Sequence, residues 1–235
     1  MKKKNTVYKP FYKYFIRLNK NVQANSKFLA FKKQKWKKLI YRENKKKKKI
    51  ILFDQNIYLK PKYGFNFTKK FKFYLNLKQN LKFFYGKLLD KKFNTIYLKS
   101  KNIIRNQKIF NKNSVFILFF LEQRLDVILY RTLCFDSIRS SQQAICHGKI
   151  FLNGKKIYNN SHLLKKGDLI TIHYSLYLHI LKNINFYKRQ LIVPKYLELN
   201  YRTFQFLIIS EISLNKISYN FPFWLNLNKL FLLNH

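Results

Sequence analysis

Acidic residues are scarce in this 235-residue chain, which has 9 Asp and Glu against 49 Lys and Arg and therefore a formal net charge of +40. Acidic partners inside the chain cannot balance this excess, so a compact state repels itself. Binding to phosphates with release of their counterions is the usual source of affinity for nucleic acids. The charge therefore predicts RNA or DNA as the partner.

Glycine is almost as scarce, at 5 residues. The sequence has no glycine-rich phosphate-binding loop and no pair of acids in a recognisable catalytic motif. Cys146 and His147 are adjacent, but neighbouring side chains on a helix do not face each other, which argues against a nucleophile and base pair. We predict that the chain is not an enzyme and uses no cofactor.

The only two cysteines are Cys134 and Cys146. Because no Cys precedes residue 134 and the five histidines lack ligand spacing, we predict no metal site. Both cysteines fall on apolar faces of expected helices, where inert buried thiols are common.

Long apolar runs are absent as well, since 115–121 and 206–209 are far shorter than the roughly 20 residues that span a bilayer, and we expect no membrane partner. Residues 1–17 resemble neither a secretory signal nor an import presequence. Residue usage favours Lys, Asn, Ile, Phe and Tyr, which have AT-rich codons, and alanine occurs only at positions 24, 30 and 144. These features, with the long basic arm, predict a protein encoded in a mitochondrion, with a plastid as the alternative.

The first 133 residues are expected to contain a basic segment, two helices and a loop. Residues 1–70 are basic and aperiodic and are expected to be partly extended on RNA, although such a segment can also be a solvated tail. Apolar residues spaced by three and four predict an amphipathic helix over 71–89, the Asn- and Lys-rich stretch 99–113 is expected to be a loop, and a second helix is expected over about 115–133.

A third helix and a small sheet are expected next. Asp136 or Ser137 can cap the helix, and Gly148 can end it. Asn153-Gly154 is a strong type I′ hairpin signal between strands 149–152 and 155–158, and a turn at 166–168 precedes a strand over 169–174.

The stretch 121–172 resembles the S4-type RNA-binding domain. The family's Leu-Glu-x-Arg-Leu-Asp helix with its following Tyr-Arg is matched by Leu121, Glu122, Arg124, Leu125, Asp126, Tyr130 and Arg131. Later matches in register are Gln143, His147-Gly148, Ile150, Leu152, Asn153-Gly154-Lys155 and Gly167-Asp168. We expect Arg124 and Asp126 to be internal polar ties at the helix junction.

The flanking segments resemble the ribosomal protein S4 family in particular. Upstream matches are Leu75, Lys78, Gln79, Leu81, Tyr85, Gly86 and Leu88, and downstream matches are Val193, Pro194, Tyr196, Leu197, Glu198 and Leu199. The resemblance, over roughly 71–233, implies a structural protein of the small ribosomal subunit that binds the 5′ domain of ribosomal RNA during assembly. It also implies a place beside ribosomal protein S5, where messenger RNA (mRNA) enters. The alternative is a non-ribosomal assembly factor or RNA-modifying accessory protein with the same domain.

The predicted fold class is α+β. Its parts are a basic N-terminal extension (1–70), a helical body (71–120), the S4-type domain with two helices and a small antiparallel sheet (121–175), and a strand-containing C-terminal segment that returns to the body (176–235). Donors suited to phosphates and 2′-hydroxyls are expected on one rim of the domain. The candidate RNA-binding residues are Arg139, Gln142, Gln143, His147, Lys149, Lys155 and Lys156. Gln142 stands where the family usually has Arg.

Overall fold

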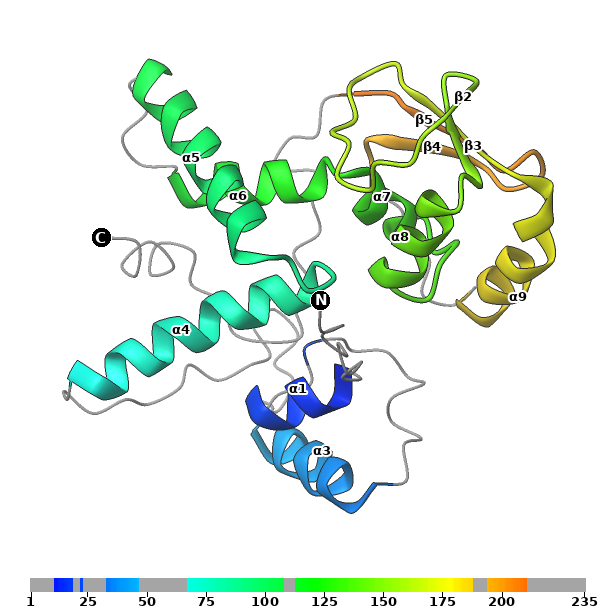
Figure 1. The fold of residues 1–235 in the computed structure, drawn as a ribbon. Coiled ribbons are helices and arrows are strands. Elements are labelled where there is room, and N and C mark those ends of the chain that lie inside the picture. Colours follow the sequence, from blue (N-terminus) through cyan, green and yellow to red (C-terminus); the bar gives the residue numbers. More distant parts are fainter. Residues whose placement is uncertain are drawn as a thin grey trace, which may run out of the picture. The chain divides into compact units, whose positions relative to one another are not determined.

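The computed structural model describes residues 11–18, 22, 33–46, 67–107, 113–187 and 194–210 (Figure 1). The chain divides into two compact units, 1–84 with 220–235, and 85–219. Strands occur in the second unit, so the described part of the chain is mixed helix and sheet, and the α+β class is confirmed. Across the described ranges, no helix is long and apolar enough to cross a bilayer.

The first unit contains α1 (Phe11–Leu18), α3 (Gln34–Lys46) and α4 (Phe67–Phe84). Phe15 and Trp36 are fully buried, with ring centroids 6.3 Å apart, and the Phe83 ring lies edge-on to Phe15 at 6.5 Å. The sequence predicts a partly extended segment over 1–70, and the parts of it that form α1 and α3 are helical. Among the side chains that the structure describes, the buried ones are Phe15 and Leu18 in α1 and Trp36 and Leu39 in α3, a pattern too short to show as periodicity.

Helix α5 (Asp90–Gln107) corrects the loop expected at 99–113, of which 108–112 lie outside the described residues. Asn and Lys are abundant here and suggested a loop, yet Phe93 and Ser100 are buried at a spacing that places both on one helical face. Asp90 in the first turn also complements the positive end of the helix dipole. Composition alone therefore gave the wrong answer where two buried positions decide the structure.

The single helix expected over 115–133 is two helices, α6 (Asn113–Glu122) and α7 (Leu125–Arg131). Between them Arg124 is extended and forms an isolated antiparallel bridge with Leu163. The Leu125 N–H donates to the His162 carbonyl at 2.9 Å, and the Leu164 N–H donates to the Gln123 carbonyl at 3.0 Å. Pairing with a segment about 40 residues away thus interrupts a stretch whose apolar pattern is continuous.

Helix α8 (Ile138–Cys146) and the sheet follow as expected. The strands are β1 (Ile150–Leu152), β2 (Lys155–Lys156), β3 (Leu169–Ile172), β4 (Leu197–Asn200) and β5 (Gln205–Ile208). Their order is β2-β1-β3-β5-β4, and every neighbouring pair is antiparallel. A short 3₁₀ turn, η1 (Tyr174–Leu176), leads from β3 into α9 (Tyr177–Tyr187).

One hydrophobic core joins α7, α8 and α9 to the sheet. Buried residues of α7, α8, α9 and four strands contribute to it, including Ile128, Ile145, Ile170, Ile180 and Phe206. Figure 1 shows α7, α8 and α9 on the same side of the sheet. The sequence predicts that the segment 176–235 contains strands and returns to the helical body. Within it, β5 pairs with β3 and carries β4, so residues 197–208 enlarge the small sheet.

The two cysteines differ in their surroundings. Cys134 lies after α7 and is fully buried, and burial raises the pKa of its thiol to about 12. Cys146, the last residue of α8, is exposed, so the expectation of a buried thiol is wrong for this residue. It fails because the apolar face of α8 follows Ile138, Ser141 and Ile145 and leaves position 146 outside.

We expect iodoacetamide to alkylate the native protein at Cys146 and to leave Cys134 unmodified at pH 8, because the thiolate is the reactive species and the Cys134 thiol is both buried and protonated. Mass spectrometry of proteolytic peptides measures this directly. Alkylation of both thiols in denaturant serves as the control, and modification of Cys134 in the native protein would contradict the structure.

Gly86 predicts a second measurable effect. It has φ +81°, and a Cβ added to it would lie 2.9 Å from both Gln142 Nε2 and Ile138 Cγ2. Gly154 has a similar φ of +79° but no atom within 4 Å of the added Cβ. We expect Gly154→Ala to lower the free energy of unfolding by about 1 kcal/mol, from backbone strain, and Gly86→Ala to lower it by roughly 2 to 4 kcal/mol, from strain plus steric overlap.

Urea denaturation followed by circular dichroism measures both variants. The comparison isolates the steric contribution because the backbone conformations match. Equal losses for the two variants would show that the Gly86 backbone does not pack closely against α8.

Candidate nucleic-acid interface

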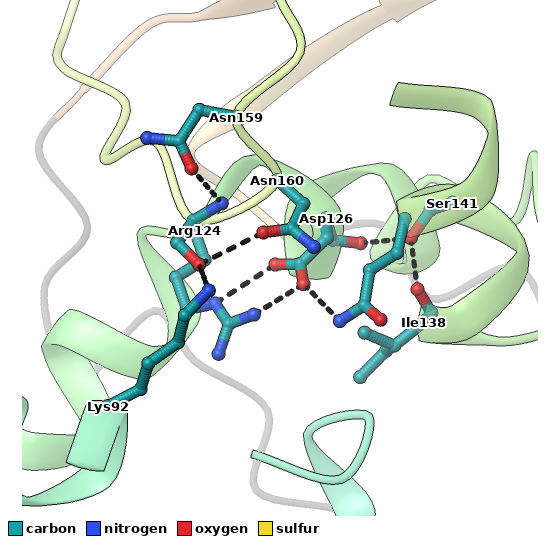
Figure 2. A network of polar contacts seen from close by, with 9 residues as sticks. Lys92, Arg124, Asp126, Ile138, Ser141, Asn159 and Asn160 are labelled. Carbon is teal, nitrogen blue, oxygen red and sulfur yellow. Dashed lines mark hydrogen bonds and ion pairs between the residues drawn. The ribbon is translucent and has the colours of Figure 1, made fainter. Parts of the chain in front are cut away.

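A buried ion pair lies at the junction of α7 and α8. The Arg124 Nε donates to Asp126 Oδ1 at 3.1 Å, its Nη2 donates to Oδ2, and the two side chains are 3% and 0% exposed. The Gln142 amide donates to Asp126 Oδ2 at 2.7 Å, and the Ser141 hydroxyl lies 2.8 Å from the Asp126 backbone carbonyl. Figure 2 shows this network, which confirms Arg124 and Asp126 as internal ties.

The electrostatics of this junction favour a fixed geometry. Burial raises the pKa of the Asp126 carboxyl, while the Arg124 charge and the hydrogen bond from Gln142 act in the opposite direction. The carboxylate therefore depends on these two donors to stay charged inside the protein. Because Asp126 belongs to α7 and Gln142 to α8, satisfying the carboxylate also fixes the two helices relative to each other.

A second ion pair uses the other charged residues of the helix motif. Arg131 donates through Nη2 and Nε to Glu122, at 2.8 and 3.1 Å, and the Tyr85 hydroxyl donates to the same carboxylate at 2.6 Å. Glu122 is 1% exposed. The charged residues that identify the motif in the sequence are therefore bonded to one another inside the protein.

Helix α8 presents the first part of the outward surface. Of the two expected cap residues, Asp136 and Ser137, it is Ser137 that caps the helix, accepting the Ser140 N–H at 3.2 Å. Arg139, Gln143 and His147 are spaced by four and share the side opposite the buried residues, with Gln143 and His147 exposed and Arg139 half-buried. Gln142 points to Asp126 instead, so the structure separates it from these three candidates.

Lys149 and the hairpin form the second part. Gly148, with φ +66°, ends α8, and the Lys149 carbonyl accepts the His173 N–H at 2.9 Å at the start of the sheet. Lys155 and Lys156 are exposed on β2, which is an edge strand. Asn153 and Gly154 have φ of +49° and +79°, which are the left-handed conformations that a type I′ turn requires.

Asp168 fixes this hairpin to the next turn. The Asn153 amide donates to Asp168 Oδ1 at 3.1 Å and its Oδ1 accepts the Leu169 N–H at 2.9 Å, while Asp168 Oδ2 accepts the Lys165 N–H at 2.7 Å. The turn holds Lys165 and Lys166 exposed. Sequence reasoning missed these two lysines, although their position directly before Gly167-Asp168 was a usable signal.

Apart from Gln142, the candidates are exposed or half-buried side chains; they are Arg139, Gln143, His147, Lys149, Lys155 and Lys156, and we call this set the basic rim. It offers hydrogen-bond donors and positive charge without a carboxylate among its members, which suits phosphate and 2′-hydroxyl contacts. In the described segments no group of three or more His, Cys, Asp and Glu residues could hold a metal ion.

Comparison with known proteins agrees with this geometry. The family model described as the S4 domain matches residues 123–170. The chain carries an S4 domain. The match runs from the residue before Arg124 into β3, so it contains both buried helices α7 and α8, the hairpin and the whole basic rim.

Curated relatives extend the similarity beyond that domain. The chain is 29% identical over 147 residues to small ribosomal subunit protein uS4 of Paracoccus denitrificans, covering 62% of this chain and 68% of the relative. It is 33% identical over 130 residues to the protein of the same name from Rickettsia typhi, covering 55% and 60%. It is 32% identical over 98 residues to the protein of the same name from Jannaschia sp., covering 42% of this chain and 45% of the relative. The matches thus span about half to two thirds of these relatives, and the resemblance to the S4 family is confirmed.

The ion pair at the helix junction predicts an asymmetry between single and double variants. Arg124→Ala leaves the Asp126 carboxylate buried without its main partner, and we expect it to lower the free energy of unfolding by about 3 to 5 kcal/mol. Replacing both residues with Leu removes the pair without leaving a buried charge, so the loss should be smaller. Chemical denaturation measures both, with the exposed Lys155→Ala as a near-neutral control. A double variant less stable than Arg124→Ala would contradict this account.

Proposed function

We propose that this chain is a structural protein of the small ribosomal subunit and binds ribosomal RNA through its basic rim. The observation that carries the proposal is that the S4 domain contains two separate sets of charged and polar residues. The motif's charged residues pair internally, while Arg139, Gln143, His147 and the rim lysines face outward from a rigid α8 and hairpin. Relatives named small ribosomal subunit protein uS4 support the ribosomal setting.

The mechanism is scaffolding. Lysines and arginines distributed over the chain neutralise phosphates where RNA helices meet, since the net charge of +40 has no internal counterpart. The basic rim fixes the orientation of one RNA helix, because α8 and β1, which carry the rim residues or lead to them, contribute buried residues to the hydrophobic core. A-form RNA exposes phosphates and 2′-hydroxyls in its shallow groove, so donors held in fixed positions can recognise its shape.

The finer assignments belong to the same proposal. We infer binding to the 5′ domain of the small-subunit RNA, with ribosomal protein S5 as neighbour and mRNA close by where it enters. These assignments rest on the resemblance of the flanking segments to the S4 family. The residue usage, which favours amino acids with AT-rich codons, supports synthesis in a mitochondrion. Locating the coding sequence in the mitochondrial or plastid genome tests that last inference.

Changing Lys149 and Lys155 together to Ala should weaken binding to a folded 5′-domain RNA fragment. Each lost phosphate contact also lowers the slope of log affinity against log salt concentration, by about 1 per contact. Filter binding across a salt series measures both effects. The matched control changes Lys182 and Lys195 to Ala, because both are exposed in the same unit but lie outside the basic rim. A slope unchanged in the rim variant would remove these lysines from the interface.

Sedimentation of salt-washed organelle lysate tests the ribosomal assignment itself. We expect the protein to migrate with mature small subunits after a wash of about 0.5 M salt, which screens and removes loosely bound basic proteins. Presence in light fractions, or with immature particles alone, would replace the ribosomal role with that of an assembly factor or RNA-modifying accessory protein.

A further inference from the structure

The sheet carries a row of aromatic rings on the face away from the core. Ile150, Ile170 and Ile172 point into the core, so the strand alternation places Phe151 and, beyond the end of β3, His173 on the opposite face. The Phe151 and His173 ring centroids lie 6.2 Å apart with an interplanar angle of 19°, and the His173 and Tyr174 centroids lie 4.2 Å apart at 34°. We call these three residues the aromatic row.

The row is open to solvent at its Tyr174 end. Tyr174 is 74% exposed, whereas Phe151 and His173 are half-buried. A ring exposed to this extent contributes little to the core and is accessible to a ligand. The Tyr174 ring is thus the solvent-exposed end of the row, and it lies against the His173 ring, which in turn lies against Phe151.

Backbone contacts hold the middle ring in place. The His173 N–H donates to the Lys149 carbonyl at 2.9 Å, and the ring Nδ1 accepts the Ser175 N–H at 3.3 Å. A ligand that stacks on this row would meet a surface that is already ordered, which lowers the entropic cost of binding.

Two lysines border the row. Lys156 is the cross-strand partner of Phe151, and its Nζ lies 5.9 Å from the Phe151 ring centroid. Lys149 lies opposite His173, and strand alternation places it on the same face as Phe151. The acid on this face, Glu198, belongs to β4, two strands from β3 and therefore roughly 10 Å away. The aromatic surface is thus flanked by positive charge.

We propose that the aromatic row binds an unpaired RNA nucleotide, whose base stacks on Tyr174 while Lys149 and Lys156 contact the flanking phosphates. Every base has a face that can stack on an aromatic ring, and neighbouring cations suit the backbone on either side. Duplex RNA does not offer these faces because its bases are stacked on each other. An apolar protein partner would have to desolvate both lysines, so the charge favours RNA.

This inference rests on the proposed function, because it needs RNA at the S4 domain, but it adds a single-stranded element to the helical one bound by the basic rim. The test uses the full chain and two labelled probes, an unstructured single-stranded RNA of roughly 12 nucleotides and a duplex of similar length. The variants are Tyr174→Leu, which removes the ring and keeps an apolar side chain, and Tyr174→Trp, which keeps a stacking surface. Leu178→Ala is the matched control, because Leu178 is 76% exposed nearby in sequence but cannot stack.

We expect Tyr174→Leu to weaken binding of the single strand roughly 5- to 100-fold and to leave its salt slope unchanged, because stacking releases no counterions. Duplex binding should not change, and Tyr174→Trp should retain single-strand affinity. Native affinity of Tyr174→Leu for the single strand, or an equal loss on both probes, or the same loss in Leu178→Ala, would overturn the proposal. None of these results alters the salt-slope test of the basic rim with folded RNA, since that test does not involve Tyr174.

Discussion

The buried pair of Arg124 and Asp126 is the constraint on which the S4 domain depends. A carboxylate with 0% exposure is tolerated only where hydrogen-bond donors satisfy it. Here the donors are Arg124, which directly precedes α7, and Gln142 of α8. Arg124 also carries the extended backbone that separates α6 from α7 and pairs with Leu163. One residue therefore joins the helix break, the helix junction and the segment before β3.

Three of the few acids in this chain occupy structural positions. Of its 9 acidic residues, Glu122 and Asp126 form buried ion pairs, and Asp168 fastens the hairpin turn to the turn before β3. Each one fixes a backbone segment and leaves the surface charge almost unbalanced. This distribution places attractive contacts beside the basic rim, where self-repulsion of a chain with a large positive excess would otherwise favour expansion.

Features set by local chemistry could be predicted from the sequence, and those set by distant partners could not. Ser137 caps α8 and Asn153-Gly154 forms the hairpin turn through contacts within a few residues, so their signals were reliable. The break at Arg124 depends on residues 162–164, and the addition of β4 and β5 depends on pairing with β3, neither of which leaves a local trace. Two buried residues, Phe93 and Ser100, likewise outweigh the loop-like composition of α5.

The candidate interface divides in the same way. Spacing identified the domain and therefore the positions of Gln143, His147 and Lys155, but a one-dimensional pattern cannot tell which way a side chain points. Gln142 and Gln143 are adjacent in sequence, yet the first bonds to buried Asp126 and the second is exposed. The helical rotation between neighbouring residues separates a positioning residue from a candidate contact.

The sheet explains why aromatic and basic surfaces come together. A sheet that packs one face on helices exposes the other, and strand alternation then fixes which side chains appear there. In this chain the positions of β1 and β2 on the face away from the core are Phe151 and Lys156, while the β3 end adds His173 and Tyr174 beside Lys149. Lys149 and Lys156 therefore belong both to the basic rim and to the border of the aromatic row. Because the two proposed contacts share this pair of cations, the RNA helix proposed for the rim and the nucleotide proposed for the row are best explained as parts of one RNA fold.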